Sequence, residues 1–215
     1  MATFDGIRSR ISYDLSETAP ITFTEDELFQ YVIEGSRLLH RVLTTIAPSF
    51  LLTQTTSAPF TIGQSTIVLP TDVLTLYEFI VSYQGKFTAL THTNLTTVLA
   101  HQSSSGVPQM WTRVKGGVQI APLPDAEYAY MLYYVPQYIP PVATTDDLGI
   151  PDAFADFAVE YAVVRAHNRN DRQTLVEQSF LNLKLDAIKA VVNSESEHTV
   201  IAPTLTVPYW QVGGW

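Results

Sequence analysis

The chain has 215 residues, no cysteine, 15% charged residues and a formal net charge of −9. The absence of cysteine excludes disulfides, Cys-based zinc sites and thiol catalysis, and 12 Lys and Arg residues without a basic run argue against tight binding to DNA phosphates. Because no stretch approaches the roughly 20 apolar residues of a membrane span and the N-terminus lacks a secretory signal, we expect a soluble protein made in a cytoplasm.

Two helices are predicted within the first 48 residues. The first is indicated by apolar residues at helical spacing, namely Ile7, Ile11 and Leu15. The second begins with a capping box formed by Thr24 and Glu27 and ends at Pro48. Its apolar positions follow at steps of three and four: Leu28, Tyr31, Val32, Gly35, Leu39, Val42 and Ile46. This pattern predicts one long amphipathic helix.

From about Phe50 to Val135 the pattern changes to short strand-like runs separated by turn residues. We expect strands at residues 50–55, 66–69, 77–83, 109–115, 118–122 and 127–135. We also expect a short helix at 93–100, with Asn94 or Thr93 as its cap. Gly116-Gly117 predicts a two-residue hairpin loop of the primed type. Both faces of the last run are apolar or aromatic, so we expect that strand to be central in a sheet or pressed against a partner.

Helices return after the Pro-rich segment 136–141. Pro151 suits the first turn of a helix, whose apolar stripe begins at Phe154 and Phe157. Asn170 and Gln173 predict a second capping box, with a helix to about residue 192. Residues 193–215 show no periodicity.

The predicted fold class is α+β, with a small helical bundle, an inserted antiparallel β-rich domain and an extended C-terminal tail. A lone amphipathic helix is only marginally stable in water, so the helices at the two ends of the chain must bury their apolar stripes together. We therefore expect residues 1–48 and 150–194 to form the bundle, 49–149 to form the inserted domain and 195–215 to form the tail.

The sequence offers no set of residues typical of catalysis or of a cofactor site. No histidine pair has zincin spacing, and there is neither a nucleophile elbow nor a phosphate-binding loop. His92 and His101 flank the predicted short helix, and ordinary surface histidines are the favoured interpretation over a metal pair. We therefore predict that the protein is not an enzyme and holds no metal or cofactor.

Aromatic residues and low charge point instead towards interactions. The low charge content fits either a compact Ser- and Thr-rich β protein or a protomer that buries much of its surface against neighbours. The β region contains eight Tyr and Trp residues that fit a packed sheet or, alternatively, a glycan-binding groove: Tyr77, Tyr83, Trp111, Tyr128, Tyr130, Tyr133, Tyr134 and Tyr138. In the tail, Tyr209, Trp210 and Trp215 are residue types enriched at interface hot spots, so we expect them to dock onto a neighbour or partner.

A series of short motifs carries a resemblance to a known family. The motifs, in order, are residues 7–15, 23–35, 65–72 with Leu69-Pro70-Thr71-Asp72, 117–124, 128–136 and 150–154. Their succession over residues 1 to about 195 resembles the head-to-tail connector, or adaptor, proteins of tailed bacteriophages.

This resemblance implies a structural virion protein rather than an enzyme. Such adaptors form a closed ring, usually of about twelve subunits, at the head–tail junction. The ring binds the portal protein on one side and the next tail component, a nozzle or a stopper, on the other, and genomic DNA passes through it without specific binding. The resemblance also suggests that Tyr209, Trp210 and Trp215 bind the portal. Another virion ring, such as a tail-completion protein, and a glycan-binding virion module are the alternatives.

Overall fold

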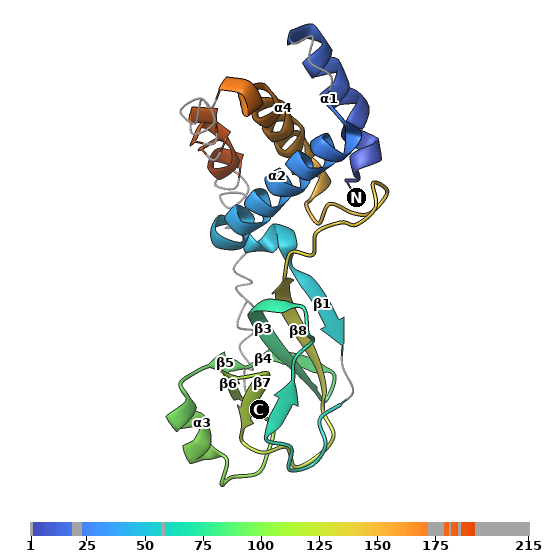
Figure 1. Cartoon of the computed structure of the whole chain (residues 1–215). Helices are drawn as coiled ribbons and strands as arrows, with labels where there is room; N and C mark the ends of the chain where they lie inside the picture. Colours follow the sequence, from blue (N-terminus) through green and yellow to red (C-terminus); the bar gives the residue numbers. More distant parts are fainter. Residues whose placement is uncertain are drawn as a thin grey trace, which may run out of the picture. The chain divides into compact units, whose positions relative to one another are not determined.

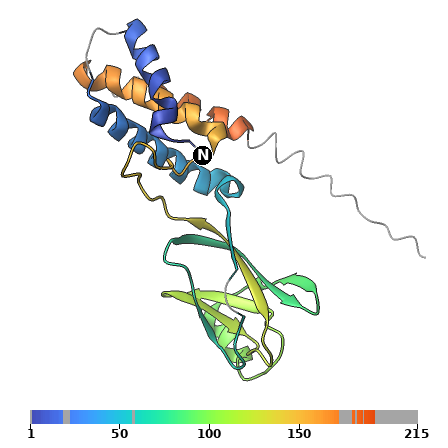
Figure 2. The ribbon, with the colours of Figure 1, turned by 90° about the vertical axis from the view of Figure 1, so that its right-hand side faces the viewer.

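The computed structural model describes residues 2–18, 23–56, 59–171, 179–180, 182–184 and 186–191. The chain divides into two compact units, Met1–Ala166 and His167–Trp215, which are described separately. The first contains helices and two four-stranded sheets (Figures 1 and 2), so the predicted α+β class is confirmed.

Helices α1 (Phe4–Thr18), α2 (Glu25–Ile46) and α4 (Ala155–Asp171) pack against one another. The rings of Phe4 in α1 and Phe29 in α2 lie 5.1 Å apart. Gly35 in α2 lies so close to Tyr161 in α4 that an added Cβ would be 2.9 Å from the Tyr161 ring. Three interhelix ion pairs surround these contacts, Arg8–Glu25, Arg10–Asp156 and Arg165–Glu34.

The predicted start of α2 is confirmed atom by atom. The Thr24 hydroxyl accepts a hydrogen bond from the Glu27 backbone N–H at 3.3 Å, and the Glu27 carboxylate accepts one from the Thr24 N–H at 3.1 Å. This reciprocal pairing satisfies two backbone donors that the first helical turn leaves without partners. After Ile46 the chain continues as a short 3₁₀ helix, η1 (Pro48–Leu51).

The strand predicted at residues 50–55 therefore starts too early. Pro48 occupies the first turn of η1, where its fixed φ favours a helical turn. The Phe50 ring packs edge-on against Phe154 at 5.1 Å and Leu51 is buried. Phe154 ends the short 3₁₀ helix η2 (Asp152–Phe154) that precedes α4, so this segment packs against η2 before strand β1 (Thr53–Thr56) begins.

The first sheet has the order β1-β8-β3-β4, with every pair antiparallel. Its remaining strands are β3 (Val73–Tyr83), β4 (Lys86–Ala89) and β8 (Ala129–Pro136). The prediction that the last strand is central is confirmed, because β8 lies between β1 and β3.

The second sheet has the order β2-β7-β6-β5. Its strands are β2 (Thr66–Val68), β5 (Thr91–His92), β6 (Met110–Val114) and β7 (Gly117–Ala121). Helix α3 (Leu95–His101), which Asn94 caps as predicted, packs on β6 and β7. The two sheets share one core, in which Phe79 of β3 lies 6.4 Å from Trp111 of β6.

The predicted Gly116-Gly117 loop is wrong by one residue. The β6–β7 loop is Lys115-Gly116, Val114 pairs with Gly117, and only Gly116 has a positive φ, of 79°. Gly117 is required for another reason, because a Cβ there would lie 2.3 Å from the Ile67 carbonyl oxygen in β2. A primed two-residue turn occurs instead between β3 and β4, where Gln84 and Gly85 have φ values of 50° and 75°.

The second predicted capping box is also wrong at its first residue. Asn170 lies inside α4, which extends to Asp171, and no Gly or Pro interrupts residues 152–171. Gln173 lies outside the described residues. Of the second unit, residues 179–180, 182–184 and 186–191 are helical, and residues 192–215, including Tyr209, Trp210 and Trp215, lie outside the described part of the chain.

Candidate interaction surfaces

The outer face of the first sheet is an apolar surface that the described elements leave partly uncovered. Helix α3 packs on β6 and β7 of the second sheet, and the inner face of the first sheet points into the core that the two sheets share. The register places Ile80, Phe87, Met131 and Tyr133 on the opposite face. Phe87 is 67% exposed and the other three are half-buried.

Polar contacts hold part of this outer face in place. The Tyr133 hydroxyl donates to the Gln54 side-chain oxygen at 3.4 Å, and the Gln54 amide nitrogen lies 3.2 Å from the Met131 sulfur. Gln54 therefore links β1 to β8 across the surface. One charged residue, the exposed Glu78 opposite Tyr133, lies on the same face. An apolar centre bordered by polar residues is the composition expected of a protein–protein interface.

Both edges of the same sheet are also open. Among the described residues, β1 pairs with β8 alone and β4 pairs with β3 alone. Figure 1 shows β1 in cyan at the margin of the sheet, with no strand beyond it. All four residues of β4 are exposed, and so are three of the four residues of β1. Each strand therefore presents one row of backbone donors and acceptors away from its own sheet.

The whole β region is poor in charge. Seven charged side chains occur among the 96 residues 50–145, and they are Asp72, Glu78, Lys86, Arg113, Lys115, Asp125 and Glu127. Average globular chains contain about 25% charged residues. Charged residues are thus scarcest in the part of the chain that forms the sheets. This favours the interpretation that neighbouring subunits cover the region.

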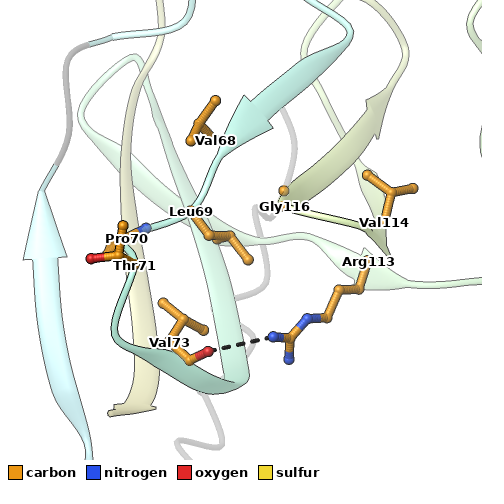
Figure 3. A pocket seen from close by; sticks show the side chains of 9 residues that line it. Val68, Leu69, Pro70, Thr71, Val73, Arg113, Val114 and Gly116 are labelled. Atoms are coloured by element: carbon orange, nitrogen blue, oxygen red, sulfur yellow. Dashed lines mark hydrogen bonds between the residues drawn. The ribbon is translucent and has the colours of Figure 1, made fainter. Parts of the chain in front are cut away.

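A pocket of about 280 Å³ lies where the β6–β7 hairpin approaches the segment between β2 and β3 (Figure 3). Its walls include Leu69, Val73 and Val114, and Val68 beside it is 81% exposed. The Arg113 guanidinium donates to the backbone carbonyl oxygens of Leu74 at 2.9 Å and of Val73 at 3.5 Å. Because its charged group is engaged in these bonds, the pocket suits an apolar side chain rather than an anion.

A second pocket, of about 400 Å³, lies between α2 and the segment after β8 and is basic. Arg37 and Arg41 are one helical turn apart and exposed. Burial lowers the pKa of His40 and raises the pKa of Tyr138, so both are neutral near pH 7. The positive charge therefore comes from the two arginines, a pair that can hold a carboxylate or a phosphate.

The other shifted pKa values have structural causes. The Tyr128 hydroxyl donates to Asp125, which raises the pKa of Tyr128 to about 12. Burial, with Asp72 as hydrogen-bond acceptor at 3.2 Å, raises the pKa of Tyr134. Each of these tyrosines links a sheet to a nearby turn through its hydroxyl group. These hydrogen bonds and burial explain the raised pKa values structurally, without an acid–base pair.

His92 and His101 engage different partners. The His92 ring packs on Trp111 at 4.6 Å, and a His101 ring nitrogen lies 2.9 Å from the Thr97 carbonyl oxygen. Within the described ranges no group of three or more His, Asp or Glu residues is arranged to hold a metal ion.

The eight aromatic residues singled out in the β region separate into two groups. Trp111, Tyr128, Tyr130 and Tyr134 are buried in the core between the sheets. Tyr138 packs on α2, where its hydroxyl lies 3.4 Å from the Ile33 carbonyl oxygen, and Tyr77, Tyr83 and Tyr133 remain at least partly accessible. Most of these aromatic residues therefore contribute to packing inside the protein.

Sequence reasoning missed the surface around Phe87, because β4 was not predicted. The signal was present in Gln84-Gly85: a two-residue turn after a strand indicates a returning strand. It also missed the basic pocket, which the spacing of Arg37 and Arg41 could have indicated. The predicted site residues Tyr209, Trp210 and Trp215 lie outside the described residues.

Comparison with known proteins decides the family. The family model described as SU10 adaptor protein matches residues 2–205, nearly the whole chain. The chain belongs to this family. The resemblance to tailed-phage adaptors is thereby confirmed, and the protein is a structural component of the virion at the head–tail junction. A search of curated proteins finds no match. None of the helices within the described residues is long and apolar enough to cross a membrane.

Proposed function

We propose that this member of the adaptor family is one subunit of a closed head-to-tail ring of about twelve copies. The ring joins the portal to the next tail component, a nozzle or a stopper, and forms part of the passage for the genome. The observation that carries this proposal is the family match over residues 2–205. In this assignment the chain has no catalytic step and no cofactor.

The domain organisation follows the same proposal. Residues 1–48 and 150–194 form a helical bundle that packs side by side around the ring, and residues 49–149 form the inserted β domain. The packing of α1, α2 and α4 around Phe29, Gly35 and Tyr161 supports the bundle. The open outer face of the first sheet and the low charge of residues 50–145 support a β domain that meets other subunits.

The net charge supports a passage that does not retain DNA. With a formal charge of −9 the protein repels a duplex on average, and such repulsion keeps DNA from binding to the wall of a channel. The arginines of the basic pocket, Arg37 and Arg41, are two isolated charges. They are too few for the multiple phosphate contacts on which non-specific DNA binding depends.

The C-terminal tail, residues 195–215, is proposed to bind the portal through Tyr209, Trp210 and Trp215. Large amphipathic aromatic residues contribute most strongly to interfaces when they fill pockets of a partner. Deletion of residues 203–215 should abolish portal binding while leaving the far-UV circular dichroism and the melting temperature unchanged. Substitution of the three aromatic residues by alanine should have the same effect, whereas Val207→Ala with Gln211→Ala in the same tail should not. Retained portal binding by the truncated chain would contradict this role.

The experiment that tests the function is a cryo-EM reconstruction of the portal vertex of the particle that carries this chain. A ring of the protein directly below the portal, with the Trp210 segment touching the portal, is the expected result. A ring located elsewhere in the tail would support a tail-completion protein instead. Absence of the protein from that vertex would refute the adaptor ring.

No observation favours the glycan-binding alternative. A glycan groove would need several exposed aromatic rings side by side, whereas Trp111, Tyr130 and Tyr134 are in the core. We therefore propose a structural function alone.

A further inference from the structure

The first sheet ends in two different open strands that suit each other. At one edge β1 (Thr-Gln-Thr-Thr) pairs only with β8, and at the other edge β4 (Lys-Phe-Thr-Ala) pairs only with β3, within the described residues. Free monomers usually protect such edges by keeping them very short, or with prolines, bulges and charges, lysine above all. Both strands have only four residues, and β4 has one lysine, Lys86, on the same face as Thr88. β1 has neither a charged residue nor a proline, so it is the less protected edge.

The directions of β1 and β4 allow these two edge strands to pair when neighbouring copies have the same orientation. Each neighbouring pair in the order β1-β8-β3-β4 is antiparallel, so β1 and β4 of one sheet run in opposite directions. A second copy placed beside the first in the same orientation therefore presents its β4 antiparallel to the β1 of the first. This is a head-to-tail contact between unlike surfaces, which generates rings when the rotation closes.

The faces of the strands restrict the register. On the inner face, Thr53 and Thr55 of β1 lie opposite Tyr134 and Leu132, and Thr88 of β4 lies opposite Val81. On the outer face, Gln54 lies opposite Tyr133 and Phe87 lies opposite Ser82. Because side chains alternate between faces, a continuous sheet must place Thr88 opposite Thr53 or Thr55 of the neighbour, and a slip of one residue would reverse every side chain.

Both allowed registers make the joined sheet staggered. Within one copy, Phe87 lies level with Ala129 of β8, whereas Thr56 and Gln54 lie level with Met131 and Tyr133. Pairing Phe87 with Thr56 or with Gln54 of the next copy thus shifts successive sheets by two or four residues. At about 3.3 Å per residue this is about 7 or 13 Å in the same direction at every contact. A constant stagger of this kind is what a sheet requires to close around an axis.

We propose that neighbouring copies in the adaptor ring pair β4 of one with β1 of the next, so that their first sheets form one continuous antiparallel sheet. This inference rests on the proposed ring and names its subunit interface. The outer faces then merge into one belt, in which Phe87 gains cover from the Gln54 or Thr56 side chain of the neighbour. Ile80, Met131 and Tyr133 of successive copies lie along the same belt.

Cysteine cross-linking tests this pairing without background, because the chain contains no cysteine. Two double variants, Thr88→Cys with Thr55→Cys and Thr88→Cys with Thr53→Cys, are introduced into the full chain and assembled into particles. Three strand spacings, about 14 Å, separate the two edges of one sheet, which is beyond the reach of a disulfide. A bond can therefore form only between copies. The matched control is Thr88→Cys with Gln54→Cys, which occupies the same strands but opposite faces.

Mild oxidation should convert one of the two matched variants into a ladder of covalent oligomers up to the full ring, while the control stays monomeric on denaturing gels. Two results would overturn the edge pairing: intact rings without cross-links in either matched variant, or equal cross-linking of the control. Neither result would contradict the ring itself. If the variants do not enter particles, the cryo-EM map of the unsubstituted ring decides. Neighbouring β4 and β1 at about 4.8 Å support the pairing, and a wider gap refutes it. Absence of any ring at the portal vertex would instead refute the proposed function.

Discussion

Replacement of Gly35 by alanine tests the close contact between α2 and α4. An alanine Cβ would lie 2.9 Å from Cδ1, 3.0 Å from Cγ and 3.1 Å from Cβ of Tyr161. Rotation of the ring cannot relieve the contact with Cβ, so α4 must shift. Overpacking of this kind destabilises by about 1–3 kcal/mol, whereas alanine stabilises a helix interior by about 1 kcal/mol over glycine. We therefore expect Gly35→Ala to lower the free energy of unfolding by about 1 kcal/mol.

Urea unfolding followed by far-UV circular dichroism, at one fixed protein concentration, measures this change. Gly6→Ala in α1 is the matched control, because Gly6 is exposed and a Cβ there meets only the Thr3 hydroxyl at 3.3 Å. The control should be neutral or more stable by up to about 1 kcal/mol. In a Tyr161→Ala background the effect of Gly35→Ala should shrink, since the two residues are in contact. If Gly35→Ala were as stable as the unsubstituted protein, the close packing of α2 on α4 would be refuted.

Three further changes have expected outcomes. Thr24→Ala removes the acceptor for the Glu27 N–H and should lower the unfolding free energy by about 1 kcal/mol in urea titrations; an unchanged midpoint would contradict the capping box. Gly117→Ala should prevent soluble expression or strongly lower the melting temperature, because its Cβ would lie 2.3 Å from the Ile67 carbonyl oxygen. Gly116→Ala, with only an unfavourable φ of 79° to accommodate, should lower the unfolding free energy by about 1–2 kcal/mol and so be the less destabilising of the two; equal effects would speak against the close approach of β2. Burial lowers the folded-state pKa of His40 below its usual value of 6.5, so the unfolded chain binds the proton more readily. The contribution of His40 to the free energy of unfolding should therefore be constant above pH 6.5. It should decline as the pH falls from 6.5 towards the folded-state pKa. His40→Asn should remove this part of the pH dependence of the melting temperature, and an unaltered profile would refute the assignment.

Local chemistry was sufficient to predict the elements whose signals lie close together in sequence. The capping box at Thr24, the cap at Asn94 and the extent of α2 depend on neighbours within one or two turns, and the structure reproduces them. The predicted apolar stripe of α2 is reproduced in part, because Phe29, Ile33 and Leu43 are buried in place of Tyr31, Val42 and Ile46. The apolar residues on both faces of residues 128–135 likewise indicated a central strand, as β8 is. The order of motifs along the chain led to the adaptor family, which the match over residues 2–205 confirms.

Only the tertiary structure decided features that depend on residues distant in sequence. Gly117 is required by a β2 carbonyl some fifty positions earlier rather than by the turn beside it. The 3₁₀ turn that contains Phe50 and Leu51 brings Phe50 against Phe154, about a hundred positions later in the chain. The faces of Phe87, Gln54 and Thr88, and the two open edges on which the proposed ring contact depends, follow from strand order and register. Periodicity within one strand fixes which residues share a face, but it contains no information about which other strand covers that face or lies beside it.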